Sequence, residues 1–370
     1  MRPTWADIDI GAVERNVARL RAHVAPAEVC AVVKADGYGH GAVAVARAAR
    51  RAGAALLAVA LVEEGVELRD AGIDGPILLL SQPSAAAMDD ARAANLTLTL
   101  YTPDGVAAAS KVARDGREPW AVHVKVDTGM HRVGCSAEEL RQMVELVDAE
   151  PSLRLEGVWT HCAVADELTD PFTETQFDRY DAAIDTAGLG ARPGLVRHAG
   201  NSAVGLAHPR GRLDLVRFGI AVYGIAPSRE LAGAVDLDPV MTLRSAVSHV
   251  HTVEPGAGVS YGLRWRAAAP TRVAVVPIGY ADGVRRDLSL RGGEVLVHGV
   301  RRPMVGVVTM DQLMIDCGDL PVAVGDEVVL LGAQGGERIT ADEVAERLDT
   351  IPYEVVCAIG ARVPRRIVEP

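Results

Sequence analysis

The chain of 370 residues carries 38 basic and 49 acidic side chains, a formal net charge of −11, and 49% of its residues are hydrophobic. Such a chain buries a large core, most simply in two domains. Its acidic balance without a basic stretch argues against nucleic-acid binding through phosphate contacts. The first residues hold charges where a secretory signal needs an apolar run, and no stretch reaches about 20 apolar residues, so we expect a cytoplasmic protein without a membrane span. Five separated cysteines without a C-x-x-C pair favour a reducing compartment and indicate neither a disulfide framework nor a metal site.

Short apolar runs alternate with helical segments through the first two-thirds of the chain. Between most of the runs, Ala, Leu and Arg recur at helical spacing, with Gly or Pro near the ends. Eight strand-helix units over somewhat more than 200 residues predict an α/β fold with an N-terminal (β/α)8 TIM-type barrel. An open doubly wound sheet is the alternative, which periodicity alone does not exclude. The predicted strands are 29–34, 56–60, 76–80, 96–100, 121–127, 155–161, 195–199 and 215–219.

The residue pattern of the sequence changes near residue 235. Val-rich runs punctuated by Gly and Pro replace the helical segments and predict β strands, with one late helix near 342–350. We therefore expect a barrel domain at 1–234 and a mostly-β C-terminal domain at 235–370. Residues 1–10 contain a strand that joins either domain, and 11–24 a helix.

Lysine is rare in this chain, which contains three lysines and 35 arginines. The amine of lysine loses its proton near neutral pH far more readily than the guanidinium of arginine, so the surviving lysines are candidates for amine chemistry. Lys111 lies in a helix-like surface segment and carries no such expectation. Lys34 and Lys125 lie at the ends of predicted barrel strands.

In a parallel barrel, functional groups come from the carboxyl ends of strands and the loops after them. At those ends stand polar residues from five different strands, a convergence that surface placement alone does not explain. The residues are Lys34, Lys125 with Arg132, His161, His198 with Asn201 and Ser202, and Arg217 with Gly219 and Ile220.

The segment around Lys34 has two interpretations. Gly37, Gly39 and Ala42, with Glu63 after the next strand, resemble a dinucleotide fingerprint, but a lysine and two more residues stand where a tight turn is expected. The alternative, which we favour, makes Lys34 a Schiff-base lysine at the barrel mouth, where partial burial favours the neutral nucleophile. Tyr38 stands nearby in the sequence.

Schiff-base chemistry points to pyridoxal 5'-phosphate, which needs a phosphate anchor and a partner for its ring nitrogen. Asn201 and Ser202 open a helical turn whose N–H groups suit a phosphate, and Gly219 and Ile220 allow close backbone approach after the last strand. Arg217 directs a permanent cation into the barrel. Facing the ring nitrogen, it would leave that nitrogen unprotonated.

Nine motifs in order across almost the whole chain are similar to those of the alanine racemase family. They are AVVKADGYGHG, VKVDTGMHRVG, THCAVAD, AGNSA, VRFGI, VSYG, GYADG, TMDQ and IPYE. Each motif is weak by itself, and the ordered set is highly specific. The resemblance implies a pyridoxal phosphate enzyme of fold type III that interconverts L- and D-alanine and supplies D-alanine for peptidoglycan.

The resemblance implies two catalytic bases on opposite faces of the substrate. Lys34 carries the cofactor and serves the D-isomer, while Tyr261 arrives from the other subunit of a homodimer and serves the L-isomer. A phenol with an ordinary pKa near 10 needs a cationic neighbourhood to act as a base. We expect His161 and Arg217 to provide it.

The resemblance also implies roles for the remaining motif residues. Arg132 binds the substrate carboxylate and the cofactor's phenolic oxygen, and Lys125 matches a lysine that is carbamylated in many members. The Met310 N–H, with Asp311 beside it, matches the second subunit's contribution to the carboxylate site. Phosphate ligands match Tyr38, Ser202, Gly219, Ile220 and Tyr353, and an entry channel matches Asp166, Tyr280, Arg286 and Ile351.

Three positions depart from the family pattern: His131 replaces a usual glycine, Thr309 a frequent cysteine and Val307 a frequent arginine. They leave racemisation of serine or other small amino acids open as the preferred reaction. Another alternative is a non-catalytic pyridoxal phosphate-binding barrel, against which the domain carrying Tyr261 and Met310 argues. Amino-acid decarboxylases share both domains, but their cysteine and glycine-rich motifs do not occur here.

Overall fold

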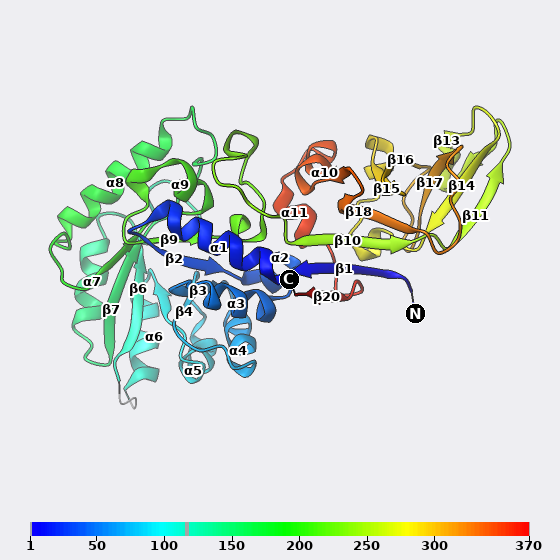
Figure 1. Ribbon diagram of the computed structural model, residues 1–370. Helices are drawn as coiled ribbons and strands as arrows, with labels where there is room; N and C mark the ends of the chain where they lie inside the picture. The colour runs from blue at the N-terminus through cyan, green and yellow to red at the C-terminus, as the bar shows by residue number, and fades with distance from the viewer. Residues whose placement is uncertain (1, 115–117, 370) are drawn as a thin grey trace. The chain divides into compact units, whose positions relative to one another are not determined.

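The computed structural model describes residues 2–114 and 118–369 (Figure 1). Contact density divides the chain into two compact units. The barrel unit holds residues 13–37 and 42–238, and the C-terminal unit holds the described residues of 1–12, 38–41 and 239–370. In both intervals that the structure describes, no helix is long and apolar enough to cross a membrane.

Eight parallel strands form the centre of the barrel unit. They pair in the orders β4-β3-β2-β9 and β5-β6-β7-β8. A parallel bridge between Leu78 and Thr97 joins β4 to the start of β5, and the Arg217 N–H donates to the Gly200 carbonyl where β8 meets β9. The ring therefore closes, which confirms the TIM-type barrel and excludes the open sheet. The strands are β2 (Glu28–Val32), β3 (Leu56–Val59), β4 (Ile77–Leu79), β5 (Leu98–Leu100), β6 (Trp120–Lys125), β7 (Leu153–Trp159), β8 (Val196–His198) and β9 (Leu215–Phe218).

Helices cover the outside of these strands (Figure 1). Helix α3 (Ala42–Arg51) turns small residues such as Ala42, Val45 and Ala49 inward and its arginines outward, the pattern of a surface helix on a sheet. Thr102 caps α6 (Pro103–Ala113) by accepting from the Gly105 N–H. The others are α1 (Ile10–Val24), α4 (Val62–Asp70), α5 (Met88–Ala93), α7 (Leu140–Asp148), α8 (Phe172–Thr186) and α9 (Ser202–Ala207), with one-turn 3-10 helices at η1 (Ala85–Ala87), η2 (Pro209–Gly211), η3 (Ile220–Tyr223) and η4 (Arg229–Leu231).

The C-terminal unit is built on a ten-stranded sheet in the order β11-β14-β17-β16-β15-β18-β10-β1-β20, with β19 beside β18. Strand β1 (Thr4–Asp9) pairs antiparallel with β10 (Met241–Ala246) and parallel with β20 (Arg365–Val368), so the first strand belongs to this sheet. Its remaining strands are β11 (His249–Val253), β14 (Thr271–Val276), β15 (Glu294–Val297), β16 (Val300–Val305), β17 (Leu313–Gly318), β18 (Glu327–Gln334) and β19 (Glu337–Ile339). Strands β12 (Gly258–Val259) and β13 (Trp265–Arg266) form a separate two-stranded sheet.

Two short helices and three 3-10 turns complete the C-terminal unit. Helix α10 (Ala341–Leu348) agrees with the late helix predicted near 342–350, and α11 (Pro352–Cys357) follows it without having been predicted. The turns are η5 (Tyr261–Leu263), η6 (Tyr280–Asp282) and η7 (Leu288–Arg291). A small apolar cluster of Val253, Val259, Ala267, Val273, Val305 and Met314 fixes the β12–β13 hairpin on the sheet.

Candidate active site

The polar residues predicted at the strand ends of the barrel unit lie on neighbouring strands. Strand β2 pairs with β9 so that Cys30 lies opposite Arg217 and Ala31 opposite Phe218. Lys34 and Gly219 consequently follow the carboxyl ends of adjacent strands. Strands β6, β7 and β8 place Lys125, Trp159 and His198 in one row by the same register.

Lys34 begins an unusual turn. The strand ends at Val32, two residues earlier than predicted, and α2 (Lys34–Gly39) is a left-handed helical turn. Such a turn costs roughly 1–2 kcal/mol for each residue with a Cβ, so it needs external support. It does not lead directly into a right-handed helix, and the dinucleotide interpretation is therefore wrong. The φ angles are +53° at Ala35, +51° at Asp36, +59° at Gly37, +52° at Tyr38 and +78° at Gly39.

Two carboxylates hold this turn within the barrel unit. Asp36 Oδ1 accepts from the Ala42 N–H at 2.9 Å, which closes the turn onto the start of α3. Glu64 accepts from the Ala35 N–H at 2.7 Å through Oε1, and from the N–H groups of Ala60 and Leu61 at 2.8 and 3.0 Å through Oε2. The loop after β2 is thereby tied to the loop after β3. Sequence reasoning singled out the neighbouring residue, Glu63, and missed Glu64.

Arg217 is a buried cation on the inside of the barrel. Its Nη1 donates to His198 Nδ1 at 2.8 Å, and its Nη2 donates to the Thr160 carbonyl at 2.8 Å and the Ala199 carbonyl at 3.1 Å. The guanidinium carbon lies 4.5 Å from the centroid of the Trp159 ring. Burial lowers the pKa of Arg217 to about 10, so the side chain is still charged at neutral pH.

His161 is neutral, contrary to the expectation that it shares the positive charge of the site. Burial and the charge of Arg217 hold the pKa of His161 well below its usual value. Its Nδ1 lies 3.2 Å from Arg217 Nη2, and a guanidinium only donates, so Nδ1 accepts and the ring proton is on Nε2. Arg217, and not His161, supplies the permanent charge.

Lys125 lies inside the barrel, 1% exposed. Its ammonium donates to the Val133 carbonyl and lies 5.2 Å from the centroid of the Trp159 ring. Burial lowers the pKa of Lys125 to about 8, against the opposing effect of Asp127. Burial therefore shifts this amine towards its unprotonated form. Arg132 lies on the exposed loop after β6, where it adds to the positive potential at Lys125 and His161.

A cradle of polar groups forms where β9 ends. Ser202 Oγ accepts from the Gly219 N–H at 3.0 Å and the Ala221 N–H at 3.5 Å. Asn201 caps α9 as predicted, because its Oδ1 accepts from the Val204 N–H at 3.0 Å. Ser202 and Ile220 are buried, so hydroxyl and N–H donors converge at a protected point after β9, the strand that pairs with β2.

The C-terminal unit carries most of the other predicted residues. The backbone joins two of its loops, since the N–H groups of Tyr280 and Ala281 donate to the carbonyls of Thr309 and Met310. Ser260, at φ +63°, ties the segment of Tyr261 to the Val307 carbonyl at 2.7 Å. Tyr261, Met310 and Tyr280 therefore lie on linked segments, with 72%, 52% and 42% of their surface exposed.

Other C-terminal residues are engaged within the unit. Asp311 pairs with Arg362 at 2.7 Å. The ring centroid of Tyr38 lies 6.1 Å from that of Tyr353, and burial raises the pKa of the Tyr38 phenol, which remains protonated. Ile351 and Arg286 are exposed, and Asp166, in the barrel unit, is half-buried.

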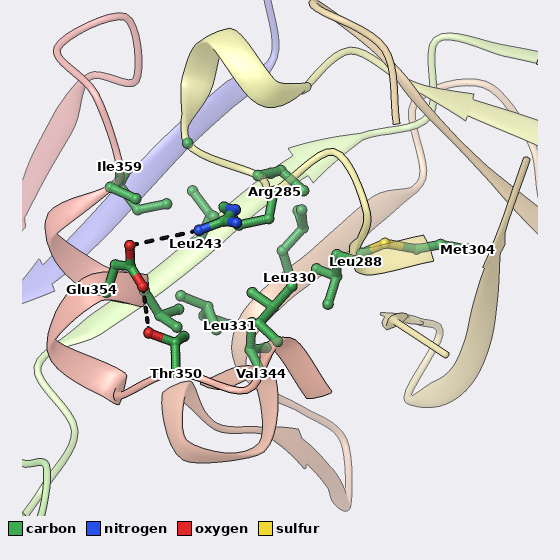
Figure 2. Close-up of a pocket in the computed structure, with 15 residues that line it drawn as sticks. Leu243, Arg285, Leu288, Met304, Leu330, Leu331, Val344, Thr350, Glu354 and Ile359 are labelled. Carbon is green, nitrogen blue, oxygen red and sulfur yellow. Dashed lines mark hydrogen bonds and ion pairs between the residues drawn. The ribbon is translucent and has the colours of Figure 1, made fainter. Parts of the chain in front are cut away.

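A small apolar cavity of about 70 Å³ lies against α11, the helix that carries Tyr353 (Figure 2). Leu243, Leu288 and Leu331 point into it. Arg285 and Glu354, 3.6 Å apart, form an ion pair at its edge. The space is lined almost entirely by carbon and contains none of the predicted site residues.

Comparisons with known proteins identify the family of both units. The model of the alanine racemase N-terminal domain matches residues 8–227, and that of the alanine racemase C-terminal domain matches residues 240–367. The chain belongs to the alanine racemase family. Alanine racemase from Symbiobacterium thermophilum is 47% identical, with 99% of this chain and 97% of that protein covered. Alanine racemase 1 of Bacillus subtilis is 40% identical, over 100% of this chain and 94% of that protein.

Solved alanine racemases have the same fold as this chain. The enzyme from D-cycloserine-producing Streptomyces lavendulae superposes with a TM-score of 0.93 at 40% identity, covering 100% of this chain and 97% of that one. The Bacillus anthracis enzyme, solved with bound L-Ala-P, gives 0.91 at 38% identity and covers 100% and 95%. The reaction is the interconversion of L- and D-alanine, an isomerisation for which the alanine racemase family uses pyridoxal phosphate.

The residues of the barrel unit fit this cofactor. An aldehyde needs a lysine, which the turn of Lys34 provides, and a phosphate needs converging donors, which Ser202 and the N–H groups after β9 provide. An unprotonated ring nitrogen accepts a hydrogen bond from a group that keeps its own proton, and the Arg217 guanidinium is such a donor.

The three departures from the alanine racemase pattern have local structural roles. His131 lies at φ +54°, a conformation that favours the usual glycine, and its N–H donates to Asp127 Oδ1 at 3.1 Å. Val307 is buried, and Thr309 Oγ1 donates to the Gln312 carbonyl at 2.8 Å.

Proposed function

We propose that Lys34 and Tyr261 of the partner subunit are the two catalytic bases of the racemisation. The observation that carries this proposal is the placement of Lys34 in a braced turn, next to the strand whose end holds Arg217 and the Ser202 cradle. When bound through Lys34, pyridoxal phosphate supplies an electron sink that acidifies the α-proton of alanine. Inversion then requires one base to take the proton from one face and a second to deliver a proton to the other.

Cofactor binding is assigned to the residues that match phosphate and ring ligands of the family. The Ser202 hydroxyl and the N–H groups of Gly219 and Ile220 hold the phosphate, with Asn201 fixing the first turn of α9. The phenols of Tyr38 and Tyr353 add two more donors. Arg217 donates to the ring nitrogen and remains charged while doing so, which limits protonation of the ring and the side reactions that follow from it.

Arg217 and His161 prepare Tyr261 of the partner subunit for its role. A phenol becomes a base near neutral pH only if its anion is stabilised. His161 is neutral and protonated on Nε2, so its contribution is a hydrogen bond, while Arg217 contributes the charge. This division replaces the two cations expected from the sequence.

Substrate binding is assigned to a cation and a backbone donor. Arg132 binds the carboxylate of alanine, assisted by the Met310 N–H and Asp311 of the partner subunit. A carbamate on Lys125 would accept from Arg132 and hold it in place. The pKa of Lys125 near 8 supports this step, because only an unprotonated amine combines with carbon dioxide.

The exposed segments of Tyr261, Tyr280 and Met310 support a homodimer in which each subunit completes the site of the other. Three large exposed side chains on linked loops are typical of a protein interface. In the dimer, Asp166, Tyr280, Arg286 and Ile351 line the entry channel, and Tyr353 narrows the pocket to small side chains. We place the enzyme in the cytoplasm, supplying D-alanine for peptidoglycan; its few separated cysteines support a reducing compartment.

Mixing two inactive variants tests the shared site. Lys34→Ala lacks one base and Tyr261→Phe lacks the other, so each homodimer should be inactive. If Tyr261 acts across the interface, a mixed dimer has one site with both bases intact, and random exchange of equal amounts restores about a quarter of wild-type activity. Lys111→Ala, an exposed lysine, is the control and should retain full activity.

The same mixing experiment also has an outcome that would contradict a shared site. If Tyr261 acts within its own chain, every site in a mixed dimer carries one defect and mixing restores nothing. Absorbance of the bound cofactor separates the two variants, since Lys34→Ala should lose it and Tyr261→Phe should keep it. An unchanged spectrum in Lys34→Ala would remove the cofactor assignment.

A further inference from the structure

A row of polar side chains runs inside the barrel from Arg217 to Glu156. Arg217 Nη1 donates to His198 Nδ1 at 2.8 Å, and His198 Nε2 lies 2.9 Å from His123 Nδ1. His123 Nε2 in turn lies 3.6 Å from Glu156 Oε2. His123, His198 and Arg217 are buried, whereas 29% of the Glu156 side chain is exposed.

The donors and acceptors of this row have one consistent direction. A guanidinium only donates, so His198 Nδ1 accepts and its proton is on Nε2. That proton is donated to His123 Nδ1, which leaves the proton of His123 on Nε2, facing the carboxylate. The tautomers of both histidines therefore follow from Arg217 at one end and agree with Glu156 at the other.

Both histidines in the row are neutral. Burial lowers the pKa of His123, and burial together with the Arg217 charge holds the pKa of His198 well below its usual value. A second proton on His123 would place two N–H groups face to face between the rings, and a second proton on His198 would face the Arg217 N–H. The only full charges in the row are the cation of Arg217 and the anion of Glu156, whose pKa the contact with His123 lowers.

A β-bulge brings Glu156 to this position. Val122 of β6 pairs with Leu155 of β7, but His123 pairs with Gly157, so Glu156 is an extra residue in β7. In a regular strand, its side chain would point away from the barrel interior, opposite to those of its neighbours. Bulges redirect side chains in this way and are frequent near functional sites.

Gly157 provides the space that the row needs. A Cβ at this position would lie 2.6 Å from His123 Nδ1 and 2.7 Å from Cε1. The backbone at Gly157 does not require glycine by a positive φ; the close approach of the His123 ring and of the Val196 carbonyl, 2.9 Å from such a Cβ, accounts for it. Glu156 and Gly157, consecutive residues of β7, thus both accommodate the His123 ring.

We propose that Glu156 is a positioning residue for Arg217 and acts through His123 and His198. The proposal rests on the proposed role of Arg217 as the partner of the cofactor's ring nitrogen. The carboxylate lines an open cavity of about 700 Å³, where hydration limits the cost of its charge. The two aligned imidazole dipoles extend its effect to the buried guanidinium and fix the direction in which Nη1 points.

Nitrogen NMR of the holoenzyme labelled in histidine tests the row itself. We expect His123 and His198 to be neutral with protons on Nε2, and assignment by His123→Gln identifies the signals. A proton on Nδ1 of His198, or a doubly protonated ring, would overturn the proposal. This measurement does not depend on the identity of the catalytic bases.

Variants of Glu156 test its effect at a distance. Glu156→Ala should shift the ring nitrogen signals of His198, which it does not touch, and lower kcat about tenfold with KM for alanine within about twofold. Glu156→Gln keeps a polar oxygen near His123 Nε2 and should recover part of the loss. If Glu156→Ala fails to fold, Glu156→Gln carries the test through the same two measurements.

Arg154→Ala is the matched control, because Arg154 is the solvent-exposed partner of Glu156 at 3.0 Å and lies on the same strand. It should change neither the His198 signals nor kcat. Unchanged His198 signals or unchanged kcat in both Glu156 variants would refute the positioning role even if the Lys34 and Tyr261 assignments hold. If those assignments fail in the mixing experiment, the measured tautomers of His123 and His198 still test whether the row exists.

Discussion

Removing the carboxylate of Glu64 should loosen the turn that carries Lys34. Glu64 accepts three backbone N–H groups, from Ala35, Ala60 and Leu61, at 2.7 to 3.0 Å. The two bonds at the start of α4 resemble a helix cap, worth about 1 kcal/mol, and the charge-assisted bond to Ala35 contributes about 1.5 kcal/mol. We therefore expect Glu64→Ala to lower the free energy of unfolding by about 2–3 kcal/mol. It should also lower activity more than a substitution of an exposed residue does.

Urea unfolding and steady-state kinetics of the holoenzyme measure this prediction. Because left-handed residues return to ordinary conformations once released, kcat should fall about tenfold, and affinity for pyridoxal phosphate should weaken. Glu64→Gln retains one acceptor oxygen and should be intermediate. Glu63→Ala removes an exposed carboxylate from the same turn of α4 and serves as the control. An unfolding free energy within about 0.5 kcal/mol of wild type, or an equal loss in Glu63→Ala, would refute the reasoning.

Three further predictions concern titratable groups. Because burial lowers the pKa of Lys125 to about 8, labelled bicarbonate should give a carbamate signal in carbon NMR that Lys125→Arg abolishes and Lys111→Arg retains. The bond to Arg301 lowers the pKa of the Glu343 carboxyl group below its usual 4.5. The ion pair therefore stabilises the fold fully above pH 4.5 and stops doing so as the pH falls through the pKa of the folded state. The stability difference between wild type and Glu343→Gln should vanish in acid. A thiol reagent should modify Cys357 much faster than the four buried cysteines, and rapid modification of more than one thiol would contradict the structure.

The barrel could be predicted from the sequence because each strand is a short apolar run that ends in a polar turn. Parallel strands in a closed barrel present their carboxyl ends on one face, so the order of the runs was enough to group residues such as Lys34, His161 and Gly219. The tyrosines and Met310 of the C-terminal unit could not be grouped this way. Their relevance came from motif resemblance, since exposed loop residues of a β domain leave no periodic signal that links them to the barrel.

Local backbone geometry was the part that the sequence concealed. A left-handed conformation at Ala35 opposes the preference of alanine, and the carboxylates of Asp36 and Glu64 that brace the turn explain why it persists. Glu64 reaches that turn from another loop, so no local pattern identifies it. The bulge at Glu156 breaks the two-residue alternation from which an inward carboxylate would have been inferred.

The barrel interior explains why these irregularities occur together. The inside of such a barrel is ordinarily filled by apolar side chains, whereas here β6, β8 and β9 turn His123, Lys125, His198 and Arg217 inward. Buried cations without compensation are destabilising, so the interior needs acceptors with fixed directions. Neutral histidines provide those acceptors, and the bulge at Glu156 provides the one carboxylate in the row with access to hydration. Departures from regular structure thus concentrate where a charged site must be held inside an otherwise apolar fold.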